Sequence, residues 1–207
     1  MIDSYSSIKE GVFTLEIKRS EFIAYSFPVG DENDAAEKLA AVRKKHYDAR
    51  HVCYAYVADV DGMVARFSDD GEPGGTAGKP ILDVIKKNGL KKSLIAVVRY
   101  FGGILLGAGG LTRAYSDCAA GVVRQCGVVK FTKKSLLGIK TDYSTYKKIS
   151  AAIKNAGETV SVEYDSSVTA VLACDNAEKS RTLLVEMTKG TAEIEMLGEK
   201  YFASEGE

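Results

Sequence analysis

The alternation of apolar and polar residues predicts extended structure near the start of the chain. Phe13, Leu15 and Ile17 alternate with polar neighbours, which is the period-two pattern of a strand with one buried face. A helix is predicted over 32–47, because Asp31 can cap its first turn. Acidic residues begin this segment and basic residues end it, an arrangement that suits the helix dipole.

The same patterns predict the remaining elements up to about residue 126. Asp61-Gly62 is a hairpin signal between two strands, and the apolar run LIAVV indicates a central strand covered on both faces. Glycines end the two later helices of this region. The expected strands are 21–29, 51–58, 63–67 and 93–100, and the expected helices are 80–88 and 111–126.

The second half of the chain has a simpler order of predicted strands and helices. The pattern predicts β-α-β-β-α-β, which is the order of a ferredoxin-like unit, and Asp175 with Glu178 forms a capping pair for its second helix. We therefore expect an α+β protein with two domains, 1–132 and 133–207, that meet in the polar segment 131–135. The expected elements are strands 136–141, 159–164, 168–174 and 192–202 and helices 143–156 and 175–189.

Composition excludes several classes of function. The 207 residues carry 28 basic and 28 acidic side chains, so no global field attracts nucleic acid or an anionic membrane. No apolar run approaches the length of a membrane span, and no signal peptide is recognisable. Four cysteines without a C-x-x-C pair and only two histidines make a zinc site improbable. We expect a cytoplasmic protein with reduced thiols, no metal and no cofactor.

Two glycine-rich stretches, Arg66–Pro80 and Val97–Tyr115, are the most unusual feature of the sequence. Each begins on a strand-like run and ends at a predicted helix start, a geometry that presents backbone N–H groups to an anion. The alternative is a pair of tight connections packed on each other. Together the stretches hold nine of the 20 glycines, namely Gly71, Gly74, Gly75, Gly78, Gly102, Gly103, Gly107, Gly109 and Gly110.

We interpret the two stretches as one binding surface for a phosphate-bearing ligand. Arg99 and Arg113 would contact phosphate, and the glycines would allow close approach. Tyr100, Phe101 or Tyr115 would either stack on a base or pack in the core. The candidate ligand-binding residues are Ser68, Asp69, Asp70, Glu72, Thr76, Lys79, Arg99, Tyr100, Gly102, Gly103, Gly107, Gly109, Gly110, Arg113 and Tyr115, and no catalytic residue or metal ligand is assigned.

The acidic residues of the first stretch admit several interpretations. Asp69, Asp70 and Glu72 could hold a hard cation, act as an acid/base pair, hydrogen-bond the backbone of a turn, or pair with an arginine of the second stretch. We favour the turn and ion-pair roles. Two nucleotide motifs fail, because a Walker A loop is broken at Pro73 and Pro80, and a dinucleotide fingerprint is broken by a threonine at position 112.

The stretches RFSDDGEPGGTAGKPIL (66–82) and VVRYFGGILLGAGGLTRAY (97–115) closely resemble the signature of the IMPACT/YigZ family. The segments KRSEFI (18–23) and HVCYAY (51–56) support the resemblance, which is strong over about 15–125. The sequence departs from the family pattern at Gly75 and at Ile104-Leu105, where Thr-Lys is common. The missing lysine argues against a required basic side chain at position 105.

The resemblance implies a fold for each domain and a role related to translation. The first domain should resemble the second domain of a small-subunit ribosomal protein, a fold shared with galactokinase-type kinases, and the second should resemble the C-terminal domain of elongation factor G. Eukaryotic relatives regulate translation through a protein partner, and nucleic-acid binding is the usual suggestion for bacterial relatives.

We therefore expect a regulatory protein that binds RNA or another component of the translation machinery through 66–80 and 97–115. One alternative is a protein–protein adaptor in translational stress regulation. Another is a phosphate-handling enzyme, for which the sequence shows no convincing catalytic set. The sequence leaves the identity of the partner and the oligomeric state open.

Overall fold

The computed structural model describes residues 2–204, which form two compact units. Unit 1 contains the residues up to Phe131 together with Ser204, and unit 2 is Thr132–Ala203. Each unit has its own apolar core. No helix within this described part of the chain is both long and apolar enough to cross a lipid bilayer.

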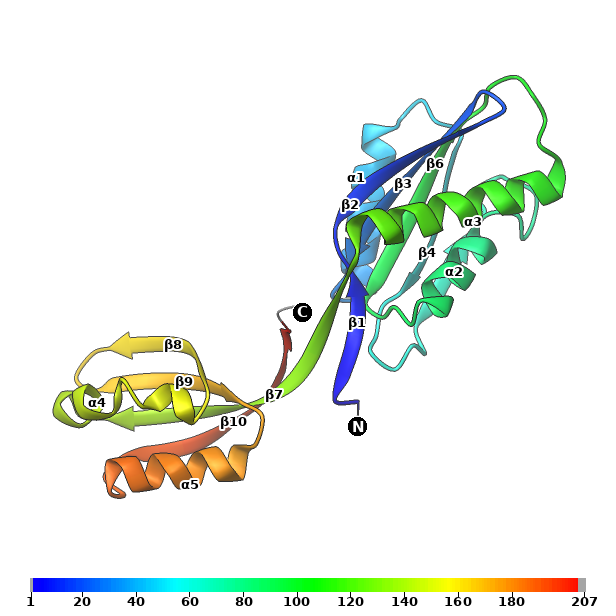
Figure 1. The fold of residues 1–207 in the computed structure, drawn as a ribbon. Coiled ribbons are helices and arrows are strands. Elements are labelled where there is room, and N and C mark those ends of the chain that lie inside the picture. The colour runs from blue at the N-terminus through cyan, green and yellow to red at the C-terminus, as the bar shows by residue number, and fades with distance from the viewer. Residues whose placement is uncertain (1, 205–207) are drawn as a thin grey trace. The chain divides into compact units, whose positions relative to one another are not determined.

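Unit 1 is built on a five-stranded antiparallel sheet (Figure 1). Its central strand has seven buried residues out of eight, as the apolar run of its sequence predicts. A further short strand, β1 (Ser4–Ile8), pairs with β7 (Val128–Thr141). The order in the sheet is β2 (Gly11–Ile17), β3 (Ser20–Pro28), β6 (Ser93–Tyr100), β4 (His51–Val57) and β5 (Ala65–Ser68).

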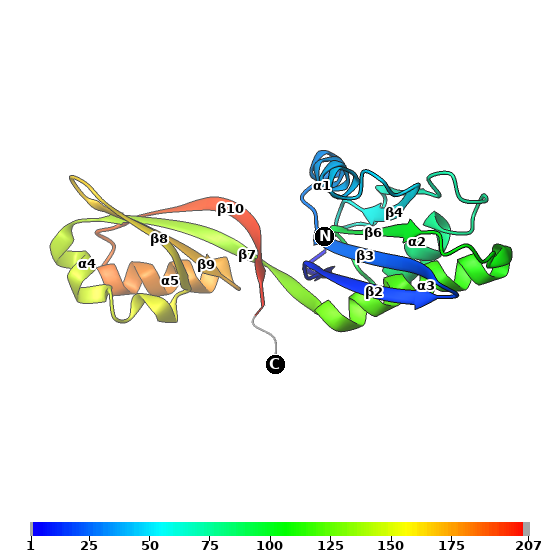
Figure 2. The same ribbon diagram turned by 90° about the horizontal axis from the view of Figure 1, so that it is seen from above.

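Helices cover both faces of this sheet. Helix α1 (Glu32–Lys45) packs on one face, and α2 (Gly78–Lys87) and α3 (Gly107–Cys126) pack on the other (Figure 2). Asp31 caps α1 by accepting the N–H groups of Asn33 and Asp34, as expected from the sequence. Strand β6 separates the two cores, because Ile95 and Val97 belong to one core while Leu94, Ala96 and Val98 belong to the other.

Unit 2 has the ferredoxin-like strand order. Its sheet runs β8–β9–β7–β10, with the first strand of the unit between the third and the last. The expected α+β class is therefore confirmed. After β7 the elements are α4 (Tyr143–Ile149), a 3₁₀ turn η1 (Ile153–Asn155), β8 (Glu158–Tyr164), β9 (Val168–Cys174), α5 (Ala177–Thr188) and β10 (Glu193–Ala203).

Several element boundaries differ from the sequence prediction. Helix α3 begins at Gly107 instead of residue 111, so the glycines expected in a loop form its first turn. Strand β7 runs unbroken through 131–135, which the sequence suggested as a connection. The helix expected over 143–156 is α4 followed by η1, and Asn176 rather than Asp175 caps α5. Strand β1 lies in the part of the chain that was expected to be extended, but the sequence did not single it out, because SYSSI is mostly polar.

Candidate anion-binding site

The first glycine-rich stretch is closed by its own aspartate. The carboxylate of Asp69 accepts the N–H groups of Gly75, Ala77 and Gly78 at 2.8, 2.9 and 2.8 Å, and so caps the start of α2. Burial opposes ionisation of Asp69, but these backbone donors outweigh it and lower its pKa. The expectation of free amides at this loop is therefore wrong for α2, because an internal anion already occupies them.

The other polar residues of this stretch also have internal partners. Asp70 pairs with Arg43 at 2.9 Å and accepts the Val52 N–H at 2.7 Å. Burial again opposes ionisation, but these contacts lower the pKa of Asp70. The remaining candidates are held locally: Ser68 accepts the Asp70 N–H, Thr76 donates to the Pro73 carbonyl, and Lys79 forms an exposed pair with Asp83.

Glu72 joins the two stretches through a buried ion pair. Its Oε1 accepts from Arg99 Nη1 at 2.7 Å and from the Tyr115 hydroxyl at 2.8 Å, and both charged side chains are at most 7% exposed. Burial raises the pKa of Tyr115, and burial also raises the pKa of Cys53, which contacts the same hydroxyl, to about 12. Of the interpretations that the sequence left open, the ion pair holds for Glu72 and the backbone role holds for Asp69.

Arg99 keeps unused hydrogen-bonding capacity. Its guanidinium lies over the rings of Phe22 and Phe101, with its carbon 5.4 and 5.5 Å from the ring centres. Its Nε is buried and has no hydrogen-bond partner among residues 2–204. A buried N–H without an acceptor costs about 1–3 kcal/mol, so this atom indicates a missing partner.

The second glycine-rich stretch is open. Helix α3 begins with Gly107, Ala108 and Gly109, all exposed, and within residues 2–204 its N-cap, Leu106, supplies no side-chain hydrogen bond to the first turn. The first amides of a helix have no partner inside the helix, and the macrodipole adds positive potential there. In contrast to α2, the start of α3 therefore presents free N–H groups to a ligand.

A cavity of about 360 Å³ brings the two stretches together. Arg99 and Glu72 lie along it, the start of α3 forms another part of the lining, and half-exposed Phe101 also lines it. Its lining includes two arginines, a histidine and one glutamate that is already paired. The lining residues are Arg50, His51, Glu72, Pro73, Arg99, Phe101, Leu105, Leu106, Gly107, Ala108 and Leu111.

Other candidates from the sequence lie away from this cavity. Tyr115 is fully buried, so its ring cannot stack on a base in this conformation. The Tyr100 hydroxyl donates to Asp48 and contacts His46 on the α1 side of the sheet. Gly102 packs against the β2–β3 turn and Gly103 is exposed, while Gly110 follows Gly109 in α3. Arg113 is exposed on α3 and does not line the cavity.

Two cavity residues, Arg50 and His51, were missed by the sequence analysis. In the sheet, His51 is paired directly with Arg99 in the antiparallel register of β4 and β6. The His51 Nδ1 hydrogen-bonds the Asp70 carbonyl at 2.8 Å, so this nitrogen carries the proton. The sequence predicted both β4 and β6. It did not show that the start of β4 pairs with the end of β6, which is what brings His51 beside Arg99.

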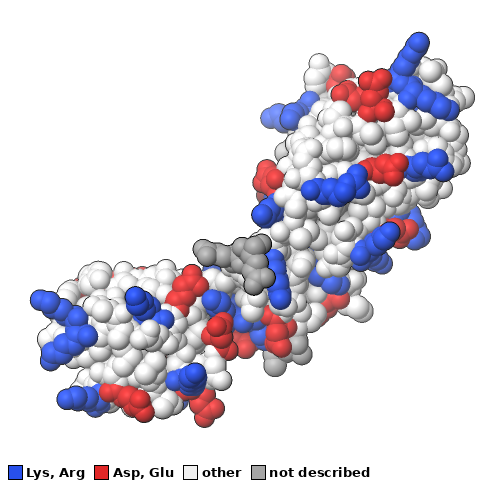
Figure 3. Space-filling view, in the orientation of Figure 1, with Lys and Arg blue, Asp and Glu red and all other residues white. Residues whose placement is uncertain are grey.

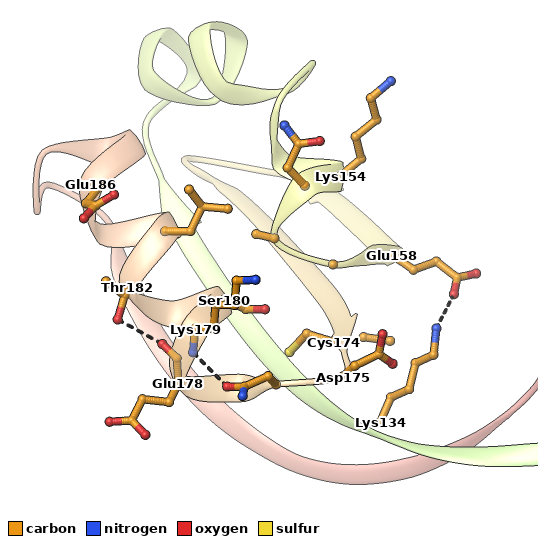
Figure 4. A pocket seen from close by; sticks show the side chains of 16 residues that line it. Lys134, Lys154, Glu158, Cys174, Asp175, Glu178, Lys179, Ser180, Thr182 and Glu186 are labelled. Carbon is orange, nitrogen blue, oxygen red and sulfur yellow. Dashed lines mark hydrogen bonds and ion pairs between the residues drawn. The ribbon is translucent and has the colours of Figure 1, made fainter.

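A larger cavity, of about 700 Å³, lies within unit 2 beside α5 and η1 (Figure 4). Its charged lining is mixed, and Lys134 already pairs with Glu158 at 3.2 Å. Neither of the two buried unpaired polar atoms found in 2–204 lines it. Nothing there marks a missing ligand. The acidic lining residues are Glu158, Asp175, Glu178 and Glu186, and the basic ones are Lys134, Lys154 and Lys179.

Comparison with known proteins identifies the family. The Impact N-terminal domain family matches residues 18–123. The IMPACT family member YvyE of Bacillus subtilis is 34% identical over 198 residues, which cover 94% of this chain and 91% of that protein. The chain belongs to the IMPACT family. The IMPACT family member YigZ of Escherichia coli is also 34% identical, over 86% of this chain and 90% of its own.

A solved structure supports the same assignment. The crystal structure of a hypothetical protein, 32% identical, is similar with a TM-score of 0.66 and covers 94% of this chain and 97% of its own. The segment matched by the Impact N-terminal domain contains both glycine-rich stretches and every residue of the 360 Å³ cavity. In this IMPACT-family chain the candidate site therefore lies wholly within the family's defining domain.

Proposed function

We propose that this chain binds RNA through the start of α3 as a regulatory component of translation. The observation that carries the proposal is the uncapped first turn of α3 beside Arg99 in a shared cavity. Exposed glycines allow a phosphate to approach the backbone closely, and oriented N–H groups then bind its oxygens. The family resemblance supports the same field of function.

Neighbouring side chains add the features that single-stranded RNA requires. Phe101 is 52% exposed at the cavity, so its ring is available to stack on a base. Arg50 is exposed beside it, and Arg113 is exposed further along α3, where each would contact a backbone phosphate. Such contacts are charge-assisted and carry little sequence information, so we expect binding with weak sequence preference.

Titration of labelled single-stranded RNA at several salt concentrations tests this function. Affinity should fall steadily as salt rises, because phosphate binding releases counterions. Arg113→Ala should weaken binding by about 1–3 kcal/mol through loss of a charge-assisted bond. Lys147→Ala, a lysine of unit 2, is the matched control and should leave the affinity unchanged. Absence of binding at low salt would remove the proposal.

A protein–protein adaptor is the second candidate, because Ile104 and Leu105 expose apolar side chains just before α3. Leu105 is 83% exposed. If the loop binds a protein, Leu105→Ser should abolish retention of a partner that survives nuclease treatment. Catalysis is not proposed, because the carboxylates of Asp69, Asp70 and Glu72 are all engaged by internal donors.

A further inference from the structure

We propose that the group recognised in the cavity is a terminal phosphate monoester, such as the 5′-phosphate of an RNA strand. This inference rests on the proposed RNA function and specifies which part of the ligand the site takes. The argument comes from where the donors lie: one set is at the surface, on α3, and another is at the buried guanidinium of Arg99.

The burial of Arg99 favours the end of an RNA strand over a phosphate within the strand. Its side chain is only 7% exposed, and it is held by Glu72 and flanked by the Phe22 and Phe101 rings. An internal phosphodiester continues into nucleotides on both sides, so it can lie across the mouth of such a hollow but cannot enter it. A terminal phosphate has a single ester bond and three free oxygens, which can point inward.

The donors around the cavity fit a group with several acceptor oxygens. Arg99 donates one N–H to Glu72, and its buried Nε has no acceptor within residues 2–204. Ala108, an exposed residue at the start of α3, and Arg50 line the same cavity. A phosphate oxygen can accept from the groups that line the cavity, and one tetrahedral group can serve donors from more than one direction.

Charge favours a monoester over a diester. A phosphate monoester carries about −1.5 to −2 charges at pH 7, whereas an internal phosphodiester carries one. The glutamate that lines the cavity is already matched by Arg99, which leaves Arg50 and the roughly +0.5 charge of the α3 dipole, about +1.5 together, to meet the charge of the ligand. The site is therefore matched to the more highly charged group.

The surface charge supports the same conclusion. The chain has no net charge, and on the face shown in Figure 3 basic and acidic side chains are interspersed in each unit. No continuous basic tract follows a polynucleotide backbone across that face. Recognition of one end group needs only a localised pocket, whereas recognition of a polynucleotide backbone needs many distributed phosphate contacts.

Two RNA oligomers of one sequence, differing only in a 5′-phosphate or a 5′-hydroxyl, provide the test. We expect the phosphorylated strand to bind about tenfold or more tightly, the effect of one or two charge-assisted hydrogen bonds. Equal, salt-sensitive affinities would overturn this inference and leave the proposed function standing. Lack of binding by both strands, and by a nucleoside 5′-monophosphate, would remove both proposals.

Competition separates the possible sources of the terminal phosphate. A nucleoside 5′-monophosphate that displaces the strand at comparable affinity would identify a free nucleotide as a sufficient ligand and would support the end-group site. Inorganic phosphate should compete weakly, because it lacks a base to stack on Phe101. Binding of the mononucleotide without binding of either RNA would support the end-group site and contradict the proposed RNA function.

A matched pair of variants locates the site. Ala108→Asp places a carboxylate at the start of α3 and should abolish the preference for 5′-phosphate, while Ala108→Asn, of the same shape, should retain it. The aspartate should not lower thermal stability, because a negative charge suits a helix N-terminus. Arg99→Lys keeps a charge opposite Glu72 and should also reduce the preference. Full preference in a folded Ala108→Asp protein would overturn the assignment.

Discussion

At the scale of single residues, neighbouring acidic side chains have three different partners. Asp69 binds backbone amides, Asp70 binds Arg43, and Glu72 binds Arg99. Asp69 connects the loop to the start of α2, and Asp70 connects it to the end of α1. Glu72 lines the cavity. The anion-binding capacity of the first stretch is therefore already used inside the protein, and only the second stretch is left for a ligand.

Asp69 should stabilise the protein by its cap and make that stability depend on pH. Asp69→Ala removes the acceptor for three N–H groups, and we expect a loss of about 1–2 kcal/mol, the usual cost of a lost cap. Asp69→Asn keeps the Oδ1 acceptor for Ala77 and Gly78 and should cost less. Urea unfolding at neutral pH measures both differences.

The sign of the pH dependence follows from the lowered pKa of Asp69. In the unfolded chain the carboxyl titrates near 3.8, and in the folded protein it titrates lower. The contribution of the charge is therefore complete above pH 3.8 and is lost as the pH falls through the folded pKa. The stability gap between wild type and Asp69→Asn should narrow in acid, and a gap that widens would contradict the capping role.

At the scale of elements, the sequence predicted whether most segments are helices or strands better than it predicted the residues at which they begin and end. Glycines 107, 109 and 110 suggested a loop on propensity, yet they form the first turn of α3, because the buried residues that follow anchor the helix to the sheet. The polar segment 131–135 suggested a connection, yet it continues β7, whose ladder with β9 includes Ser135. In both cases tertiary contacts outweighed local preference.

The sequence also predicted only part of the candidate site. Arg99, Glu72 and the α3 glycines were found from the sequence, because they lie in two unusual stretches. Arg50 and His51 were not, because only the pairing of β4 with β6 places them beside Arg99. Nor did the sequence decide which aspartate would cap α2, since Asp69 and Asp70 are adjacent and alike.

Gly102 is expected to be required for packing between elements and not for ligand approach. A Cβ at this position would collide with the backbone of Arg19 and with the Ser20 nitrogen in the β2–β3 turn. Gly102→Ala should therefore lower the free energy of unfolding by about 1–3 kcal/mol, as overpacking does. Gly74→Ala is the control, because nothing lies within 4 Å of its Cβ. Denaturant unfolding of the two variants makes the comparison, and equal stabilities would show that the turn yields without cost.

At the scale of the whole molecule, the two units are expected to be separable in function. Within 2–204, no residue of the two cores of unit 1 lies beyond Cys126, and the core of unit 2 begins at Leu137. Every cavity residue of the candidate site lies between 50 and 111. Truncation after Phe131 would remove most of β7 and the Ser204–Lys130 backbone bond but would leave these cores intact.

Residues 1–131 produced alone should therefore fold and retain the ligand. A chain of this length buries enough surface for an independent core, so a single cooperative thermal transition is expected by circular dichroism. The fragment should bind 5′-phosphorylated RNA with the affinity of the full chain, because no residue of the cavity is lost. A folded fragment that no longer binds would show that unit 2 contributes to recognition, and the site would then have to be extended beyond the α3 cavity.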